Sequence, residues 1–151
     1  MDQPEIIAVN IEKQQIVSTT IQLSKNYQAT YSLPKKYLYE PNASLLKTGG
    51  FEAVSELFAL DKLHQHSHLY TADEIKDFQG RRFEIMHEIP FQKNDLKKHI
   101  QNQKMNVTTR NFPLKVEDIK KKYKISDGGT LFAFFTTNLK NEKIVLLCTK
   151  I

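Results

Sequence analysis

Apolar and polar residues alternate along residues 6–11 and again along residues 16–23. A period of two predicts β-strands, because successive side chains of a strand point to opposite faces. The polar residues 12–15 between the two stretches predict a hairpin connection. Residues 27–33 carry a weaker form of the pattern and are expected to form a third strand.

Helices are predicted in the next segment. The stretch 37–42 is expected to lead into a helix with Pro41 in its first turn, a position that suits proline. The pair Gly49 and Gly50 then ends it, since glycine is favoured after a helix C-terminus. A second helix follows over residues 51–58, where aromatic and aliphatic residues recur on one side. Residues 69–71 predict a short strand, and 78–81 a turn.

From residue 81 the pattern becomes denser. The expected order is strand, helix, strand, helix, strand, strand, at about residues 83–89, 94–100, 104–110, 115–123, 131–137 and 144–148. Asn94 is expected to cap the first helix, whereas Lys115 is a poor cap for the second. The fold class is therefore α+β or α/β. It combines a hairpin-and-helix segment in residues 1–80 with a βαβαββ domain in residues 81–151.

The strand at 104–110 has one apolar and one polar face. Met105 and Val107 alternate with Asn106 and Arg110, and Pro113 ends the run because proline has no N–H for a strand ladder. Lysine-rich segments precede and follow it. A polar strand face between basic helices favours a polyanionic partner, most plausibly RNA, although a solvated strand between solvated helices would give the same pattern.

Charge is unevenly distributed along the 151 residues. Residues 81–124 hold 12 Lys or Arg and 5 Asp or Glu, a net charge of +7, whereas residues 1–80 hold 7 and 10, a net charge of −3. Such an asymmetry favours binding to nucleic acid or to another anionic surface.

Nine residues are the predicted RNA contacts. Arg110 is assigned to phosphate, with a salt bridge to Glu84 or Glu88 as the alternative. The asparagines would read a base edge or a 2′-hydroxyl, or else bond their own turns. The lysines on the helices would supply a diffuse positive field. The full set is Lys97, Lys98, Lys104, Asn106, Thr108, Arg110, Asn111, Lys120 and Lys121.

Other chemistry is not expected. The histidines at 64, 66 and 68 have a spacing that a zinc site can use, but the motif lacks a fourth ligand, so a polar loop is favoured. Cys148, the single cysteine, lies in an aliphatic run and is expected to be inert. A single cysteine and an N-terminus without signal-peptide features fit the cytoplasm. No apolar run is long enough to span a bilayer, so no membrane partner is expected.

Several strings in order, at residues 34–42, 68–71, 78–81, 106–113 and 127–129, resemble a known protein family. They are similar to the C-terminal region of bacterial class I S-adenosylmethionine-dependent methyltransferases, best represented in Bacteroidetes, which resemble RNA methyltransferases. The resemblance implies a small ferredoxin-like segment followed by a THUMP-like domain. It also implies RNA, either rRNA or tRNA, and a methyltransferase domain in cis or in trans as partners.

The sequence departs from that family in lacking its catalytic part. It has no glycine-rich cofactor loop after a strand and no Asp-Pro-Pro or Asn-Pro-Pro motif. We therefore expect no catalytic residues, no cofactor and no activity in this chain alone, with S-adenosylmethionine bound by the family's upstream domain. The expected function is a non-catalytic module that presents RNA to that domain. The alternative is a protein-interaction module that packs on and orients it, and a free-standing enzyme ranks last.

Overall fold

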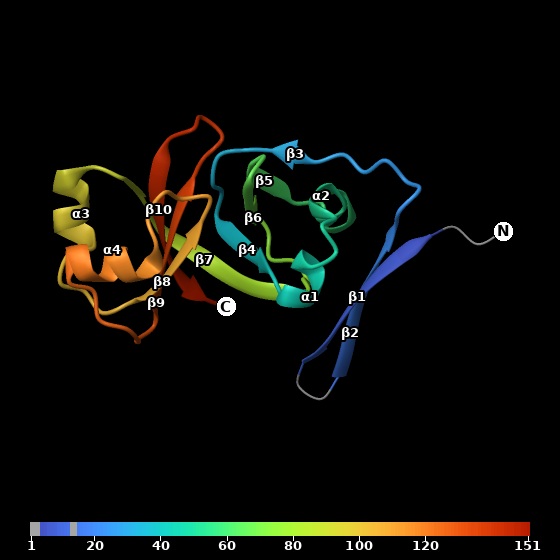
Figure 1. The fold of residues 1–151 in the computed structure, drawn as a ribbon, viewed down its shortest axis with the longest axis horizontal. Helices are drawn as coiled ribbons and strands as arrows, with labels where there is room; N and C mark the ends of the chain where they lie inside the picture. The colour runs from blue at the N-terminus through green and yellow to red at the C-terminus, as the bar shows by residue number, and fades with distance from the viewer. Residues whose placement is uncertain (1–3, 13–14) are drawn as a thin grey trace.

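The structure is a computed structural model that describes residues 4–12 and 15–151 (Figure 1). The two predicted N-terminal strands are present as β1 (Glu5–Glu12) and β2 (Gln15–Gln22), an antiparallel hairpin. The predicted connection at residues 12–15 includes residues 13 and 14, which lie outside the described residues. All other strands form one eight-stranded sheet, in the order β3-β5-β6-β4-β7-β10-β9-β8.

The middle of the chain contains more strand than the sequence predicted. The expected third strand is reduced to two residues. Residues 37–41, for which no strand was predicted, form one that is buried along its whole length. The stretch leads into a helix as expected, but Pro41 lies in the strand and not in the first helical turn. Pro41 ends that strand, where its missing N–H is tolerated. The elements are β3 (Thr30–Tyr31), β4 (Tyr37–Pro41), α1 (Ala43–Leu46), α2 (Phe51–Phe58), β5 (Asp61–His64) and β6 (Ser67–Ala72).

Local capping explains where α1 begins. The side chain of Asn42 accepts a hydrogen bond from the backbone N–H of Leu45 at 3.1 Å, so Asn42 is the N-cap, one residue after the proline. The helix ends at Leu46 with Lys47 as its C-cap, two residues before the predicted end at the glycine pair. Gly49 follows with a φ of +69°, in the left-handed region that glycine adopts readily.

The C-terminal half has the predicted βαβαββ order. Its elements are β7 (Gly80–Pro90), α3 (Lys93–His99), β8 (Asn106–Arg110), α4 (Val116–Tyr123), β9 (Leu131–Thr137) and β10 (Lys143–Lys150). Gln92, not Asn94, is the N-cap of α3. Lys115 is the N-cap of α4 and makes no side-chain capping bond, as expected. β8 pairs parallel to β9 and forms one edge of the sheet.

The sheet continues across the predicted domain boundary. β4 pairs antiparallel to β7, with Pro41 opposite Gly80 and Tyr37 opposite Glu84. The two parts of the chain therefore share backbone hydrogen bonds and not merely a side-chain interface. The division into residues 1–80 and 81–151 stays a prediction.

The core has three parts. Under α1, α2 and the hairpin, a cluster centres on Tyr39 and Tyr70. Helices α3 and α4 cover one face of the C-terminal strands and bury Ile100 and Ile119 against it. The opposite face of the same strands carries a third cluster, which includes Leu38, Leu63, Leu69, Phe83, Phe134, Leu146 and Cys148.

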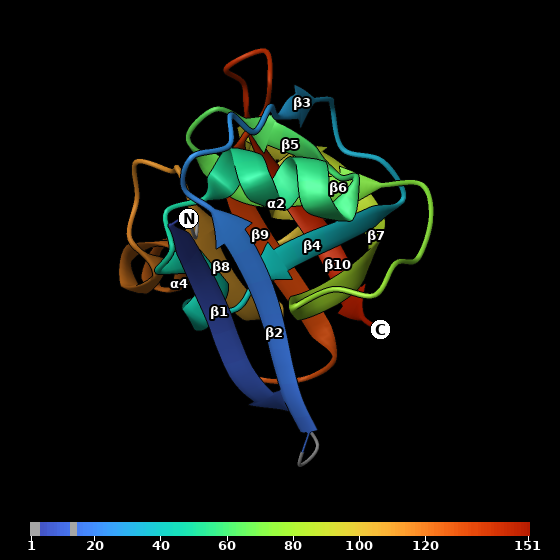
Figure 2. The same ribbon diagram turned by 90° about the vertical axis from the view of Figure 1, so that its right-hand side faces the viewer.

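The sheet curls around this third cluster. Ser67, at the start of β6, donates a hydrogen bond from its hydroxyl to the carbonyl of Thr137 at 2.9 Å, and the Thr136 hydroxyl lies 3.2 Å from the Ser67 oxygen. In the sheet order, β6 and β9 are separated by three strands. Only a strong curl brings them together. Figure 1 shows α3 and α4 at the opposite end of the molecule from the hairpin, and Figure 2 shows the hairpin in front of the other strands.

We predict that Gly80→Ala lowers the free energy of unfolding by about 1–3 kcal/mol, the usual cost of overpacking. A Cβ at Gly80 would overlap the carbonyl oxygen of Glu40 and lie 2.9 Å from Cα of Pro41, in the β4–β7 pairing. Urea unfolding measures the effect. Thr130→Ala, at an exposed position, serves as control and is expected to stay within about 0.5 kcal/mol of wild type. Equal stability of Gly80→Ala and wild type would contradict the tight approach.

Candidate nucleic-acid interface

The polar face of β8 is turned into the curl of the sheet. Val107 packs with the core beneath α3 and α4, so by strand alternation Asn106, Thr108 and Arg110 point to the other side. All three are half-buried. The predicted row of donors is therefore partly enclosed, and it does not lie on the same face of the sheet as the basic helices.

Arg110 forms an ion pair with Glu40. Its Nη2 lies 2.9 Å from Oε2 of that carboxylate, and Nε of Arg81 lies 2.6 Å from Oε1. The Glu40 side chain is only 7% exposed, whereas the side chains of Arg81 and Arg110 are 39% and 33% exposed. The Arg81 guanidinium also lies over the rings of Phe83 and Phe132, at 5.2 and 5.5 Å from their centroids. One buried carboxylate thus connects β4, β7 and β8.

This ion pair is the kind of role that the sequence left open as the alternative for Arg110. The partner, however, is Glu40 and not Glu84 or Glu88. The two residues are 70 positions apart. No local pattern reveals such a pairing, because only the curl of the sheet brings β4 opposite β8.

The other predicted residues of the strand have structural surroundings as well. Asn106 donates from Nδ2 to the carbonyls of Gly129 and Leu131, at 3.2 and 3.1 Å. Asn111 donates to the hydroxyl of Ser67 at 3.3 Å. Thr108 is half-buried on the inner face, and Lys104 is exposed just before the strand. The asparagines thus bond more distant segments, not their own turns.

The predicted lysines lie on the outer surface of α3 and α4. Lys97, Lys98 and Lys121 are exposed, whereas Lys120 is half-buried and pairs with Asp127 at 3.1 Å. Neighbouring exposed lysines that the sequence assignment left out extend the same surface: Lys93, Lys122 and Lys124. We call these seven residues the lysine surface. The nine predicted contacts therefore separate into an inner strand group and an outer helix group.

A cleft opens between α3 and α4 within the lysine surface. Its volume is about 410 Å³, and it is lined by Phe91, Lys93, Leu96, Lys97, Gln101, Lys122 and Tyr123. No motif in the sequence marked Phe91, Gln101 or Tyr123 as functional residues. The one sequence signal for this cleft is the pair Lys93 and Lys97, four residues apart on one helix, together with Tyr123 on the next helix.

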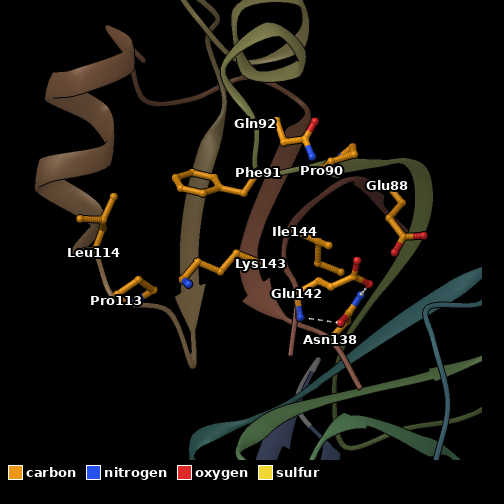
Figure 3. Close-up of a pocket in the computed structure, with 10 residues that line it drawn as sticks. All are labelled: Glu88, Pro90, Phe91, Gln92, Pro113, Leu114, Asn138, Glu142, Lys143 and Ile144. Carbon is orange, nitrogen blue, oxygen red and sulfur yellow. Dashed lines mark hydrogen bonds between the residues drawn. The ribbon is translucent and has the colours of Figure 1, made fainter. Parts of the chain in front are cut away.

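A larger pocket of about 780 Å³ lies on the other side of Phe91 (Figure 3). Proline, leucine and isoleucine side chains line it, with Glu88, Glu142 and Lys143 among the polar groups. Partial burial, followed by the charge of Glu142, raises the pKa of Glu88. Asn138 holds Glu142 through its side-chain amide, at 3.2 Å from Oε1. This acidic pocket is unsuited to phosphate.

The histidines lie around the β5–β6 turn, and the rings of His64 and His66 have centroids 5.7 Å apart. His64 Nε2 contacts Oδ1 of Asn141 at 2.7 Å, and His68 stacks on Phe51 with ring centroids 3.6 Å apart. Within residues 4–12 and 15–151, no group of three His, Cys, Asp or Glu side chains is placed to hold a metal ion.

Burial raises the pKa of the Cys148 thiol to about 12, so it is protonated at neutral pH. None of the described helices is long and apolar enough to cross a membrane.

We predict that Glu40→Gln and Arg110→Met each lower the free energy of unfolding by about 1–3 kcal/mol, because each leaves buried charged or polar groups without their partner. The double variant should lose less than the sum of the two single losses, by at least about 0.5 kcal/mol, since both remove one interaction. Chemical denaturation of the four proteins gives the coupling. Lys121→Met, at an exposed lysine, is the control and should be neutral. Strict additivity would show that the ion pair contributes nothing.

The chain resembles known proteins in two adjoining segments. Residues 37–78 match a family described as a ferredoxin-like domain, and residues 80–150 match a family described as THUMP domain-like. No curated protein sequence matches the chain.

A solved structure gives a likeness over almost the whole chain. It is the crystal structure of a "putative methyltransferase from Porphyromonas gingivalis W83", with 33% sequence identity and a TM-score of 0.85. The match covers 97% of this chain but only 38% of that one. The protein is thus similar to part of a larger chain. It has a mixed α+β fold with a ferredoxin-like domain and a THUMP-like domain.

Proposed function

We propose that this chain is the non-catalytic RNA-binding module of an S-adenosylmethionine-dependent RNA methyltransferase. It binds structured RNA, either rRNA or tRNA, and presents it to a methyltransferase domain that acts in cis or in trans. The observation that carries the proposal is the lysine surface on α3 and α4, located in the segment that matches the THUMP domain-like family. The likeness to the larger chain from Porphyromonas gingivalis W83 supports the methyltransferase part of the proposal.

The physical argument for RNA is electrostatic. Six of the seven lysines of the surface project into solvent. Lysines of this kind neutralise phosphates and release counterions, which gives an affinity that falls steeply with salt. In this proposal the helices supply most of the phosphate contacts. The inner group on β8 contributes mainly by holding the sheet edge in place, because Arg110 already pairs with Glu40.

Catalysis is assigned to a separate methyltransferase domain and not to the residues of this chain. The methyltransferase domain would bind S-adenosylmethionine and carry the catalytic residues, while this chain orients RNA against it. The covered fraction of the solved relative leaves 62% of that chain outside the match, which is ample room for such a domain.

We predict that structured RNA binds the isolated chain with a strong salt dependence. Lys98→Ala and Lys121→Ala should each weaken binding and reduce the slope of log affinity against log salt by about one unit at most. Lys47→Ala, an exposed lysine just after α1, is the matched control and should behave as wild type. Filter binding at several salt concentrations provides the measurement. Binding that is absent, or equally weakened by all three variants, would argue against the lysine surface.

A second candidate function is a protein-interaction module that packs on the methyltransferase domain. It is favoured by the outer face of the β1–β2 hairpin, where four aliphatic side chains are exposed. Ile7 is 55%, Val9 49%, Ile11 74% and Ile16 75% exposed, and Ile11 lies directly opposite Ile16. The other face of the hairpin packs on the body through Ala8 and Ile21. A row of exposed aliphatic residues on a ribbon favours contact with another protein surface.

We predict that the Ile11→Ser/Ile16→Ser double variant folds normally but binds the methyltransferase domain encoded with this chain at least about tenfold more weakly, since two buried aliphatic contacts are lost. Leu57→Ser, which removes an exposed leucine from α2, is the control. Titration calorimetry between separately purified parts measures the affinity. The interaction role is refuted if the double variant binds as well as the control. Self-association of the wild type through the same residues would point to a second copy instead.

A further inference from the structure

The cleft between α3 and α4 combines two kinds of side chain. Phe91, Leu96 and Tyr123 provide apolar walls, while Lys93, Lys97 and Lys122 stand around them. Its volume of about 410 Å³ lies within the range of small-ligand pockets, roughly 300–1,000 Å³. This combination of aromatic walls and cations distinguishes the cleft from the rest of the lysine surface.

The apolar walls are fixed by the core. Leu96 is 3% exposed, and Phe91 stands edge-to-face to Tyr123 with centroids 6.4 Å apart. Phe91 is also edge-to-face to Phe112 at 5.0 Å and to Phe135 at 6.4 Å. Neighbours on several sides hold the Phe91 ring in position. The cleft is therefore preformed, and a ligand would not have to order its walls.

The three lysines of the cleft are available to bind an anionic ligand. Lys93 and Lys97 lie four residues apart, from the start of α3 to its last turn, and Lys122 comes from the facing turn of α4. In the described part of the chain, none of the three is within ion-pair distance of a carboxylate. Lys122 Nζ lies over the Tyr123 ring, 5.6 Å from its centroid. A bound anion would not compete with an existing ion pair.

The neighbouring pocket shows that the two sides of Phe91 differ in charge. That pocket is lined by two carboxylates and one lysine, Glu88, Glu142 and Lys143, whereas the described residues lining the cleft include three lysines and no acidic residue. A ligand with both a flat apolar part and a phosphate is repelled on the acidic side. On the other side, the lysines attract it.

We propose that this cleft binds a single unpaired nucleotide of RNA, an inference that rests on the proposed function. The base lies against the walls formed by Phe91 and Tyr123, because every base has a π-face that packs on aromatic side chains. The adjoining phosphates lie among Lys93, Lys97 and Lys122. Unpaired nucleotides are the part of an RNA whose bases are free to enter such a site.

The first test uses the full chain and adenosine monophosphate as the probe, followed by NMR. Adenosine monophosphate should shift the signals of Gln101 and Tyr123, and it should bind more tightly than either adenosine or inorganic phosphate alone. Lys97→Ala and Lys122→Ala should weaken its binding by roughly fivefold to tenfold, as expected for loss of a charge-assisted contact. Lys98→Ala and Lys121→Ala remove the same charge beside the cleft and should have less than about a twofold effect. Binding of phosphate as tight as that of the nucleotide overturns the inference.

The second test separates the cleft from general RNA binding. A hairpin RNA with a one-nucleotide bulge should bind wild type more tightly than the same hairpin fully paired. Gln101→Trp places a large ring in the cleft without removing charge, so it should abolish that preference and keep the salt dependence. Its melting temperature shows whether it is folded. Equal binding of both RNAs by wild type refutes the nucleotide site and leaves the proposed function intact. If neither RNA binds, the proposed function fails, while the adenosine monophosphate titration still decides the cleft.

Discussion

The buried carboxylate of Glu40 is the constraint around which the curled sheet is arranged. It lies on β4, near the middle of the sheet, and it binds Arg81 on β7 and Arg110 on the edge strand β8. A carboxylate buried without a partner would be strongly unfavourable, and Glu40 has two partners, Arg81 and Arg110. The ion pairs thereby hold the edge strand β8 close to β4 and β7. Hydrogen bonds of Ser67, to the carbonyl of Thr137 and from Asn111, hold β6 close to the same edge of the sheet.

The curl also determines which basic residues are available to a partner. It turns the polar face of β8 inward, against an apolar cluster that contains Phe134 and Leu146. The opposite face of the same strands is covered by α3 and α4, whose outer surfaces carry the lysines. Arg110 therefore lies on the inner face of β8, paired with Glu40, whereas the solvent-exposed lysines lie on the helices that cover the opposite face. The hairpin, at the far end of the molecule, presents an apolar surface instead (Figure 1).

Local periodicity was sufficient for most of the secondary structure. The βαβαββ order of the C-terminal half, the first hairpin and α2 all follow from spacing within short windows, and the structure confirms them. The errors occurred where other effects outweighed that signal. Residues 37–41 form a strand because β6 and β7 pair with both of its edges, which overrides the preference of Pro41 for a helix start. Asn94 was expected to cap α3, but the N-cap is Gln92, two residues earlier.

The sequence by itself therefore determined the first hairpin, the elements of the C-terminal half and their order, the concentration of positive charge in residues 81–124 and the burial of Cys148, because each depends on neighbours within a few positions. Only the tertiary structure decided the environment of the candidate site. Pairing of Arg110 with Glu40 joins residues 70 positions apart, and the cleft requires α3 and α4 to lie next to each other with Phe91 between two pockets. Such contacts depend on how the sheet curls and how the helices pack on it. Both are set by the whole chain and cannot be read from any short stretch of sequence.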